Sequence, residues 1–209
     1  MPTRVHLCGD VVRLEPMGLE HVDDLLAAAQ EDRSSYGYTL VPAHADTMRA
    51  YVEHALAEER RGVALPFVTR LASSGRVVGS TRFLDIECWT GPSGRLGGPE
   101  QDTPSVVEIG STWLAPSAQR TAVNTEAKLL MLGHAFDVWG VERVTFKTDA
   151  RNERSRAAIV RLGAQPEGIR RAHMLAADGG IRDSAYYSLL RSEWPDVRIA
   201  LQARLGAGR

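Results

Sequence analysis

One stretch of the chain decides the fold: residues 106–148, which read VVEIGSTWLAPSAQRTAVNTEAKLLMLGHAFDVWGVERVTFKT. Val106–Leu114 reads as a strand, and Ala115–Asn124 reads as a turn. A helix then runs from Thr125 to Gly140, and a second strand follows at Val144–Thr148. A turn that presents backbone N–H groups before a helix N-terminus is a ready site for an anion. The stretch therefore points to a ligand that carries phosphate.

The whole sequence sets broad limits on what the protein does. Its 209 residues, 44% hydrophobic and 24% charged, are typical of one globular domain. A net charge of −1 does not favour nucleic acid as a partner. No apolar run suits a membrane span, and the N-terminus lacks the apolar segment of a signal peptide, so a cytoplasmic location is the default expectation. Cys8 and Cys88 are expected to be two separate reduced thiols.

Periodicity and turn signals predict the elements around this stretch. Before it we expect a strand at Val11–Leu14, helices at Leu19–Gln30 and Asp46–Arg61, and a hairpin of strands at Ala64–Ala72 and Arg76–Ile86.

The glycine- and proline-rich segment Cys88–Pro104 is expected to be an exposed loop. After the central stretch we expect a helix at Asn152–Leu162, strands at Gln165–Ala176 and Ser184–Leu190, and a last helix from Ser192. The predicted class is α/β, with a mixed sheet in one domain. That domain would span residues 1–209, with a core at 11–190 and a C-terminal helix at 191–209.

Four groups of residues follow one another in a recognisable order. They are Ile109–Leu114 with Pro116, Thr125-Glu126-Ala127, Asn152 and Ser155-Arg156 with Leu162-Gly163-Ala164, and Glu167–Arg170 with Asp178-Gly179 and Arg182-Asp183. In this order and spacing they resemble the GNAT superfamily of acetyl-CoA-dependent N-acetyltransferases, and in particular its RimJ/RimL-like branch. The resemblance extends over about Val11 to Leu190.

This resemblance implies a mostly antiparallel sheet with one splayed parallel strand pair, flanked by helices. It implies acetyl-CoA as the donor and a primary amine, either a protein N-terminus or a small amine, as the acceptor. Pro116 cannot continue strand pairing, so it would help to part the two central strands. Relatives are often homodimers, and the C-terminal helix could cover the chain's own sheet or a partner.

The chain departs from the family pattern at two places. In the pyrophosphate loop Gln119–Asn124, Ala122 replaces the central glycine and Arg120 stands where glycine is frequent. Asn124 fills the last small position and tolerates a positive φ, and the Arg120 guanidinium could reach a phosphate. The tyrosine that many relatives use as a general acid would fall at Ile159, which has no proton to give.

The resemblance assigns a set of residues to the cofactor. We expect acetyl-CoA to contact Trp113, Leu114, Gln119, Arg120, Thr121, Ala122, Val123, Asn124, Thr125, Lys128, Asn152 and Ser155. Within this set, the Leu114 N–H is a candidate donor to the thioester carbonyl. Ser155 either hands a proton to the departing sulfur or serves only as a first-turn capping residue. Lys128 either contacts a phosphate or is a solvated surface lysine.

The acceptor site needs a general base and residues that surround the acceptor. Glu108 is the first candidate for the base, although a carboxylate on a strand is also an ordinary ion-pairing group. Asp183 is the second candidate. His173 is a third, because a histidine can titrate near neutral pH, although a lone histidine on a strand is often only packed or exposed; with Glu108 it is also expected to contact the acceptor. Tyr36, Tyr38 and the loop Cys88–Pro104 are expected to border the acceptor.

Two rival functions remain at this point. One is a GNAT-like module that binds acyl-CoA or a partner without turnover, which the replaced glycine and the missing tyrosine favour. The other is a dinucleotide enzyme, against which the sequence has no Gly-x-Gly-x-x-Gly after a strand. The histidines show no metal-ligand spacing. No histidine neighbours Cys88 in sequence and Cys8 lies outside the motifs, so a cysteine nucleophile is not expected.

Overall fold

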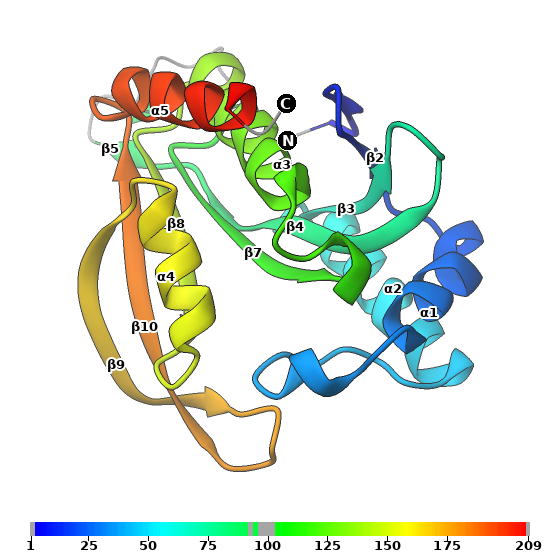
Figure 1. The fold of residues 1–209 in the computed structure, drawn as a ribbon. Coiled ribbons are helices and arrows are strands. Elements are labelled where there is room, and N and C mark those ends of the chain that lie inside the picture. Colours follow the sequence, from blue (N-terminus) through cyan, green and yellow to red (C-terminus); the bar gives the residue numbers. More distant parts are fainter. Residues whose placement is uncertain (1–2, 92–93, 96–102, 208–209) are drawn as a thin grey trace.

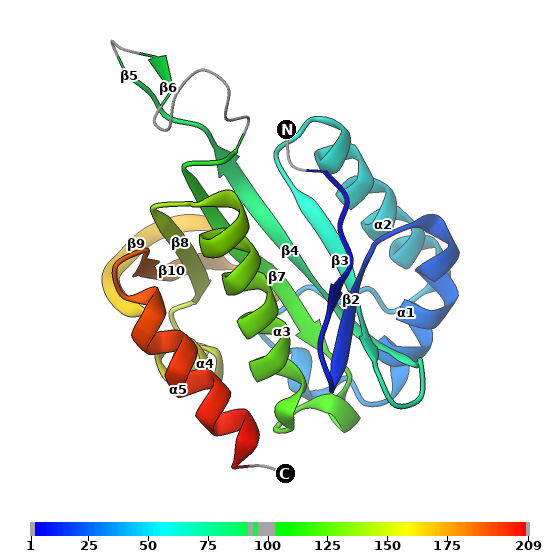
Figure 2. The same cartoon turned by 90° about the horizontal axis from the view of Figure 1, so that it is seen from above.

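The computed structural model describes residues 3–91, 94–95 and 103–207. Its centre is an eight-stranded sheet in the order β1-β2-β3-β4-β7-β8-β10-β9 (Figures 1 and 2). The strands are β1 (Leu7–Cys8), β2 (Val12–Pro16), β3 (Leu65–Leu71), β4 (Val77–Glu87), β7 (Val106–Leu114), β8 (Arg143–Asp149), β9 (Gln165–Leu175) and β10 (Ile181–Leu190). Neighbours pair antiparallel throughout except for β7 and β8, which are parallel. The predicted mixed, mostly antiparallel sheet is confirmed.

Helices cover both faces of this sheet (Figure 2). They are α1 (Val22–Gln30), α2 (Ala45–Arg60), α3 (Ala122–Gly133), α4 (Glu153–Arg161) and α5 (Trp194–Gly206). The first two pack together on one face, whereas α3 and α5 pack together on the other. Short 3-10 turns precede α1 at Leu19–His21, follow it at Ser34–Tyr36, and follow β7 at Pro116–Ala118. No helix in the described part of the chain is long and apolar enough to cross a membrane.

The core between α3 and the sheet is aromatic and aliphatic. The Phe83 ring on β4 lies 5.9 Å from that of Phe67 and 4.6 Å from that of Trp139, centroid to centroid. Glu126 ties α3 to the N-terminal strands, since its buried carboxylate accepts the N–H groups of Val11 and Val12 at 2.7 Å each. The start of α3 is thereby held at a fixed place against the sheet.

The central strands β7 and β8 separate soon after they meet. They pair only from Val106 with Arg143 to Glu108 with Thr145. Beyond that point β7 stays with β4 as far as Leu114, while β8 stays with β10 (Figure 1). The predicted splayed parallel pair is therefore confirmed. The β7 edge that faces the opening has no strand partner beyond Glu108.

A bulge bends β7 beside this opening. Ser80 pairs with Trp113 but Arg82 pairs with Gly110, so β7 holds one residue more than β4 there. Ser111 takes the extra turn with a φ of 47°. Gly79 permits the close approach on β4, because a Cβ at that position would lie 2.1 Å from the Trp113 carbonyl oxygen.

Several predicted boundaries shift. The helix predicted from Thr125 begins at Ala122, so the last three residues of the predicted turn form its first turn. It continues through a π-helix at His134–Trp139 and ends, as predicted, at Gly140, whose φ is 69°. The strand predicted from Ser184 begins at Ile181. Most of the predicted loop Cys88–Pro104 lies outside the described residues.

Two short strands lie within that loop. β5 (Thr90–Gly91) pairs with β6 (Gly94–Arg95). The last helix begins at Trp194 rather than at Ser192. Cys8 and Cys88 are both free and exposed.

Candidate active site

The turn after β7 leads into the N-terminus of α3. Arg120 is exposed and has a φ of 59°, so the positive φ of this turn falls on Arg120 and not on Asn124. Thr121 caps the helix, because its Oγ1 accepts the Val123 N–H at 3.3 Å and donates to the Ala118 carbonyl at 2.7 Å. A helix leaves its first N–H groups without intrahelical partners, and Thr121 satisfies only that of Val123. Within the described part of the chain, the N–H groups of Ala122 and Asn124 have no side-chain acceptor, so they are available to an anion.

A hydrogen-bonded bridge crosses the opening next to this turn. Gln119 Nε2 donates to the Leu114 carbonyl at 2.8 Å and to Ser35 Oγ at 2.9 Å. Arg154 reaches over from α4 and donates to the Ser35 carbonyl at 2.7 Å and to Gln119 Oε1 at 3.3 Å. Tyr36 Oη also donates to the Leu114 carbonyl, at 3.1 Å. The unpaired edge of β7 thus offers a polar carbonyl at Leu114, and the side chains of Gln119 and Tyr36 occupy it.

Glu108 occupies the point at which β7 and β8 part. Its side chain is only 3% exposed, and its Oε2 lies 2.9 Å from Lys147 Nζ on β8. Burial raises the pKa of the Glu108 carboxyl above its ordinary value, although the Lys147 ammonium acts in the opposite direction. Gly110 provides the space for this carboxylate, because a Cβ there would lie 2.5 Å from Glu108 Oε1.

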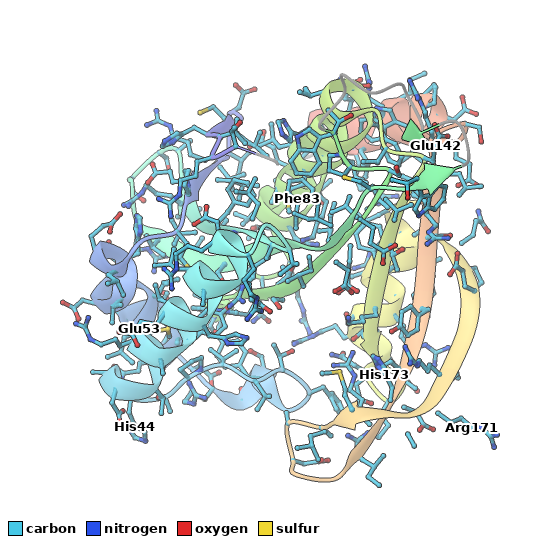
Figure 3. All side chains as sticks on the ribbon, turned by 180° about the vertical axis from the view of Figure 1, so that it is seen from behind. His44, Glu53, Phe83, Glu142, Arg171 and His173 are labelled. Atoms are coloured by element: carbon cyan, nitrogen blue, oxygen red, sulfur yellow. The ribbon has the colours of Figure 1, made fainter. Side chains whose placement is uncertain are left out.

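Strand register places further polar groups on the same face as Glu108. Lys147 lies opposite Tyr186 on β10. The Tyr186 hydroxyl lies 3.2 Å from His173 Nε2, and His173 Nδ1 lies 2.9 Å from Ser184 Oγ. Figure 3 shows His173 near the end of the β9–β10 hairpin, across from the segment that follows α1. Glu108, Lys147, His173, Ser184 and Tyr186 are named here the charged cluster.

The electrostatics of the charged cluster keep its histidine neutral. Burial lowers the pKa of His173, and the positive charges of Arg170 and Lys147 lower it further. For Lys147, burial acts to lower the pKa, but the charge and hydrogen bond of Glu108 raise it overall. Near neutral pH the cluster therefore holds an ammonium, a carboxylate and an uncharged imidazole.

A comparison with known families decides what this arrangement belongs to. A model of the "Acetyltransferase (GNAT) domain" matches residues 12–165 of the sequence. The chain belongs to the GNAT acetyltransferase family. The resemblance predicted from the four residue groups is confirmed.

Relatives of this acetyltransferase support the same assignment. A GCN5-related N-acetyltransferase from Brucella melitensis is 31% identical and superposes with a TM-score of 0.82 over 100% of this chain and 91% of its own. YdaF of Bacillus subtilis (strain 168), provisionally named a ribosomal N-acetyltransferase, is 36% identical over 87 residues, which are 42% of this chain and 46% of that protein. The matched part thus spans about half the length of that curated relative.

A more distant structure shares the fold alone. RimL, described as a ribosomal L7/L12 alpha-N-protein acetyltransferase in complex with coenzyme A, is 18% identical and covers 89% of this chain and 98% of its own at a TM-score of 0.69.

Asn152 and Ser155, which were predicted to contact the cofactor, lie at the N-terminus of α4. Asn152 Oδ1 accepts the Ser155 N–H at 3.0 Å and so caps α4. The Ser155 hydroxyl has no hydrogen-bond partner among the residues that the structure describes. The cap is made by Asn152, and the Ser155 hydroxyl is left available for another role. Ile159, at the position where many relatives carry a tyrosine, is buried in the core.

Lys128 does not lie where a phosphate contact would need it. Its ammonium is buried between α3 and the sheet, where it donates to Thr81 Oγ1 at 2.9 Å and to Thr112 Oγ1 at 2.7 Å. Burial lowers its pKa to about 7. Both expectations for Lys128, a phosphate contact and a solvated lysine, are corrected, because the side chain points into the sheet.

The geometry of Asp183 does not support a role as a base. Its Oδ1 accepts the Ala172 N–H at 2.7 Å, where β9 bulges and Ala172 has a φ of 48°. Side chains alternate along a strand, so Asp183 points to the face opposite that of Ser184. Asp183 therefore stabilises the β9–β10 hairpin.

The aromatic residues predicted around the site have distinct places. Trp113 is buried and packs edge-on against Tyr36, with ring centroids 6.1 Å apart, so it supports the wall of the site from the core. Burial raises the pKa of Tyr36 to about 12, which keeps it a hydrogen-bond donor. Tyr38 is exposed, and the Arg151 guanidinium lies 5.3 Å from its ring centroid. Arg151 also bonds Asp178 at 2.8 Å and so links Tyr38 to the hairpin turn.

Sequence reasoning did not assign Lys147, Arg154, Ser184 or Tyr186 to the site. None of the four belongs to the quoted family motifs. Strand pairing brings in Lys147, Ser184 and Tyr186, and hydrogen bonds to Ser35 and Gln119 bring in Arg154. Among the described residues, no group of three or more His, Cys, Asp or Glu side chains is arranged to hold a metal ion.

Proposed function

We propose that the protein transfers the acetyl group of acetyl-CoA to a primary amine by direct attack. The observation that carries this proposal is the position of Glu108. It is a buried carboxylate with a raised pKa, placed where the two central strands part, and it joins the unpaired edge of β7 to the rest of the charged cluster. A base so placed lies within reach of both substrates of a two-substrate transfer.

The residues of the donor side suit a nucleotide thioester. The free amides at the start of α3 and the exposed Arg120 would hold the diphosphate. The polar β7 edge, including the Leu114 carbonyl, would pair with the amide-rich arm of the cosubstrate. For that to happen, the Gln119 side chain must leave the Leu114 carbonyl. Asn152 and Ser155 would line the other side of the opening.

The reaction assigns one task to each residue. The neutral amine attacks the thioester carbonyl carbon, so that a C–N bond forms and the C–S bond breaks. The amine nitrogen loses a proton to the Glu108 carboxylate, and the departing sulfur takes one from the Ser155 hydroxyl, which solvent restores. Burial raises the basicity of Glu108, while Lys147 holds its carboxylate in place. An α-amino group, with a pKa of about 7.7–8.0, needs only mild help at neutral pH.

The proposed acceptor site lies beside the charged cluster. It is bordered by the segment with Tyr36 and Tyr38 and by the β9–β10 hairpin, which Arg151 joins. A protein N-terminus or a small primary amine would place its amino group beside Glu108. The ribosomal name of the Bacillus subtilis relative favours a peptide N-terminus.

A turnover screen tests the proposal. The protein would be incubated with acetyl-CoA and a panel of N-terminal peptides, aminoacyl compounds and aminoglycosides, with free thiol and product mass as readouts. We expect an N-acetylated product whose formation falls strongly in Glu108→Gln. Calorimetric binding of acetyl-CoA without thiol release from any acceptor would instead favour an acyl-CoA-binding module, for which the alanine at position 122 is the sequence argument.

A further inference from the structure

Arg182 is a partly buried cation near the charged cluster. It lies on β10 and is half-buried, and its Nε is enclosed with no hydrogen-bond acceptor. Within the described part of the chain, no hydrogen bond or salt bridge engages its guanidinium. A buried N–H donor without an acceptor carries a desolvation cost. The position therefore suits an anion supplied from outside the chain.

Three of the neighbouring cations are each paired with a carboxylate, whereas Arg170 on β9 is exposed. Lys147 pairs with Glu108 at 2.9 Å, and Arg82 pairs with Glu58 at 3.1 Å. Arg151 pairs with Asp149 at 2.8 Å. The nearby carboxylates are thus already engaged, and Arg182 interacts with Asp149 and Glu108 only through longer-range charge.

Strand register directs Arg182 toward the acceptor. Ser184 lies opposite Asp149 and Tyr186 lies opposite Lys147, so these side chains share the face of Glu108. Residues two apart on a strand lie on one face, and Arg182 precedes Ser184 by two. Its guanidinium therefore lies on the same side of the sheet as Glu108 and Lys147.

We propose that Arg182 binds an anionic group of the acceptor, so that the preferred substrate is a primary amine with a carboxylate or phosphate near its amino group. This rests on the proposed transferase function. A guanidinium offers a planar pair of N–H donors that match a carboxylate or a phosphate. Held in this way, the acceptor would present its amine to Glu108. The same chemistry comes from the α-carboxylate of an amino acid or from an acidic side chain of an N-terminal peptide.

Matched acceptors test this inference. L-serine and L-serinamide differ in the α-carboxylate alone, and the peptide amides Ser-Asp and Ser-Asn differ in a side-chain carboxylate. For at least one pair, we expect the charged member to show a kcat/KM about tenfold or more above that of its neutral partner, the scale of one charge-assisted hydrogen bond. Which pair responds identifies the source of the anion.

Variants connect the preference to Arg182. Arg182→Gln should bring the ratio within each responding pair close to one, and Arg182→Lys should retain part of it. Arg171→Gln is the matched control, because Arg171 is exposed on the same hairpin and points outward (Figure 3). A wild-type ratio near one for both pairs, or a ratio that Arg182→Gln leaves unchanged, would overturn the inference.

A binding readout separates this inference from the transferase proposal. N-acetyl-L-serine and its amide, and the acetylated peptide pair, would be titrated calorimetrically into the protein with CoA. An anion preference that depends on Arg182, in a protein that acetylates none of the amines, would reject the transferase and keep the anion site. Acetylation of the amines without any such anion preference would keep the transferase and reject the anion site.

Discussion

One ionisable side chain is buried against each face of β7, and the two side chains have different surroundings. On the α2 side, Glu108 is 3% exposed and has a cationic partner, Lys147. On the α3 side, Lys128 is 5% exposed and has only the hydroxyls of Thr81 and Thr112. Burial shifts both pKa values toward the neutral form, but only Glu108 lies where β7 and β8 part. Under the proposed mechanism, burial alone does not make a group catalytic, and access to the two substrates distinguishes Glu108 from Lys128.

Removing the Glu108 carboxylate should have the largest effect on activity. Glu108→Gln should lower kcat about a hundredfold or more, the range of a lost general base. In the wild type the base acts when deprotonated, so the rate falls as the pH drops through the raised pKa of Glu108. The variant should lack that acid limb. An unchanged pH profile would remove Glu108 from the mechanism.

Displacing the same carboxylate should have a smaller effect. In Gly110→Ala the new Cβ meets Glu108 Oε1 at 2.5 Å and Leu84 Cδ1 at 3.0 Å, so the carboxylate must shift. Steady-state assays should show kcat lowered roughly tenfold to a hundredfold, since misplacement of about 1 Å is costly. Gly206→Ala, which meets nothing within 4 Å, is the control. Equal activity in both would show that the position of Glu108 is not critical.

The hydroxyl of Ser155 tests the donor side of the opening. Ser155→Ala keeps the N–H that Asn152 binds, so the α4 cap should persist. We expect kcat to fall roughly tenfold or less, because the sulfur leaves readily, while the calorimetric Kd for CoA stays unchanged. Full activity would leave Ser155 without a role beyond its backbone N–H.

The opposite face should affect stability and not turnover. Lys128→Met should change kcat less than about twofold. Because the folded pKa of Lys128 is about 7 and its ordinary value is 10.5, the unfolded chain binds more protons between these pH values. Wild-type stability should therefore rise relative to the variant by roughly 1 kcal/mol per pH unit across that window. Denaturant titrations at several pH values measure the free energy of unfolding of both proteins. If the difference between them did not change with pH, the Lys128 ammonium would be solvated in the folded protein.

The fold was largely predictable because its signals are local. The apolar run of β7, the turn before α3 and the glycines that end α3 and α4 each mark an element in their own sequence. The element boundaries were less predictable. The predicted start of α3 at Thr125, instead of at Ala122, put Lys128 in the first turn of the helix and close to the expected cofactor. The true start places Lys128 deeper, against the sheet.

The charged cluster was only partly predictable, for a physical reason. Glu108 and His173 stood out by residue type, but Lys147 meets Glu108 only through the parallel pairing of β7 with β8. Tyr186 joins through the β8–β10 register, and Arg182 lies on the same strand two residues before Ser184. The bulge that Asp183 braces has no sequence signal, so the hydrogen bond from the Ala172 N–H to this acid could not be predicted.

A crystal structure of the protein with CoA tests the central claim most directly. We predict a diphosphate at the amides of Ala122 and Asn124, an arm along the β7 edge in place of the Gln119 side chain, and a thiol directed toward Glu108. A CoA molecule bound elsewhere, with Gln119 still on the Leu114 carbonyl, would contradict the account.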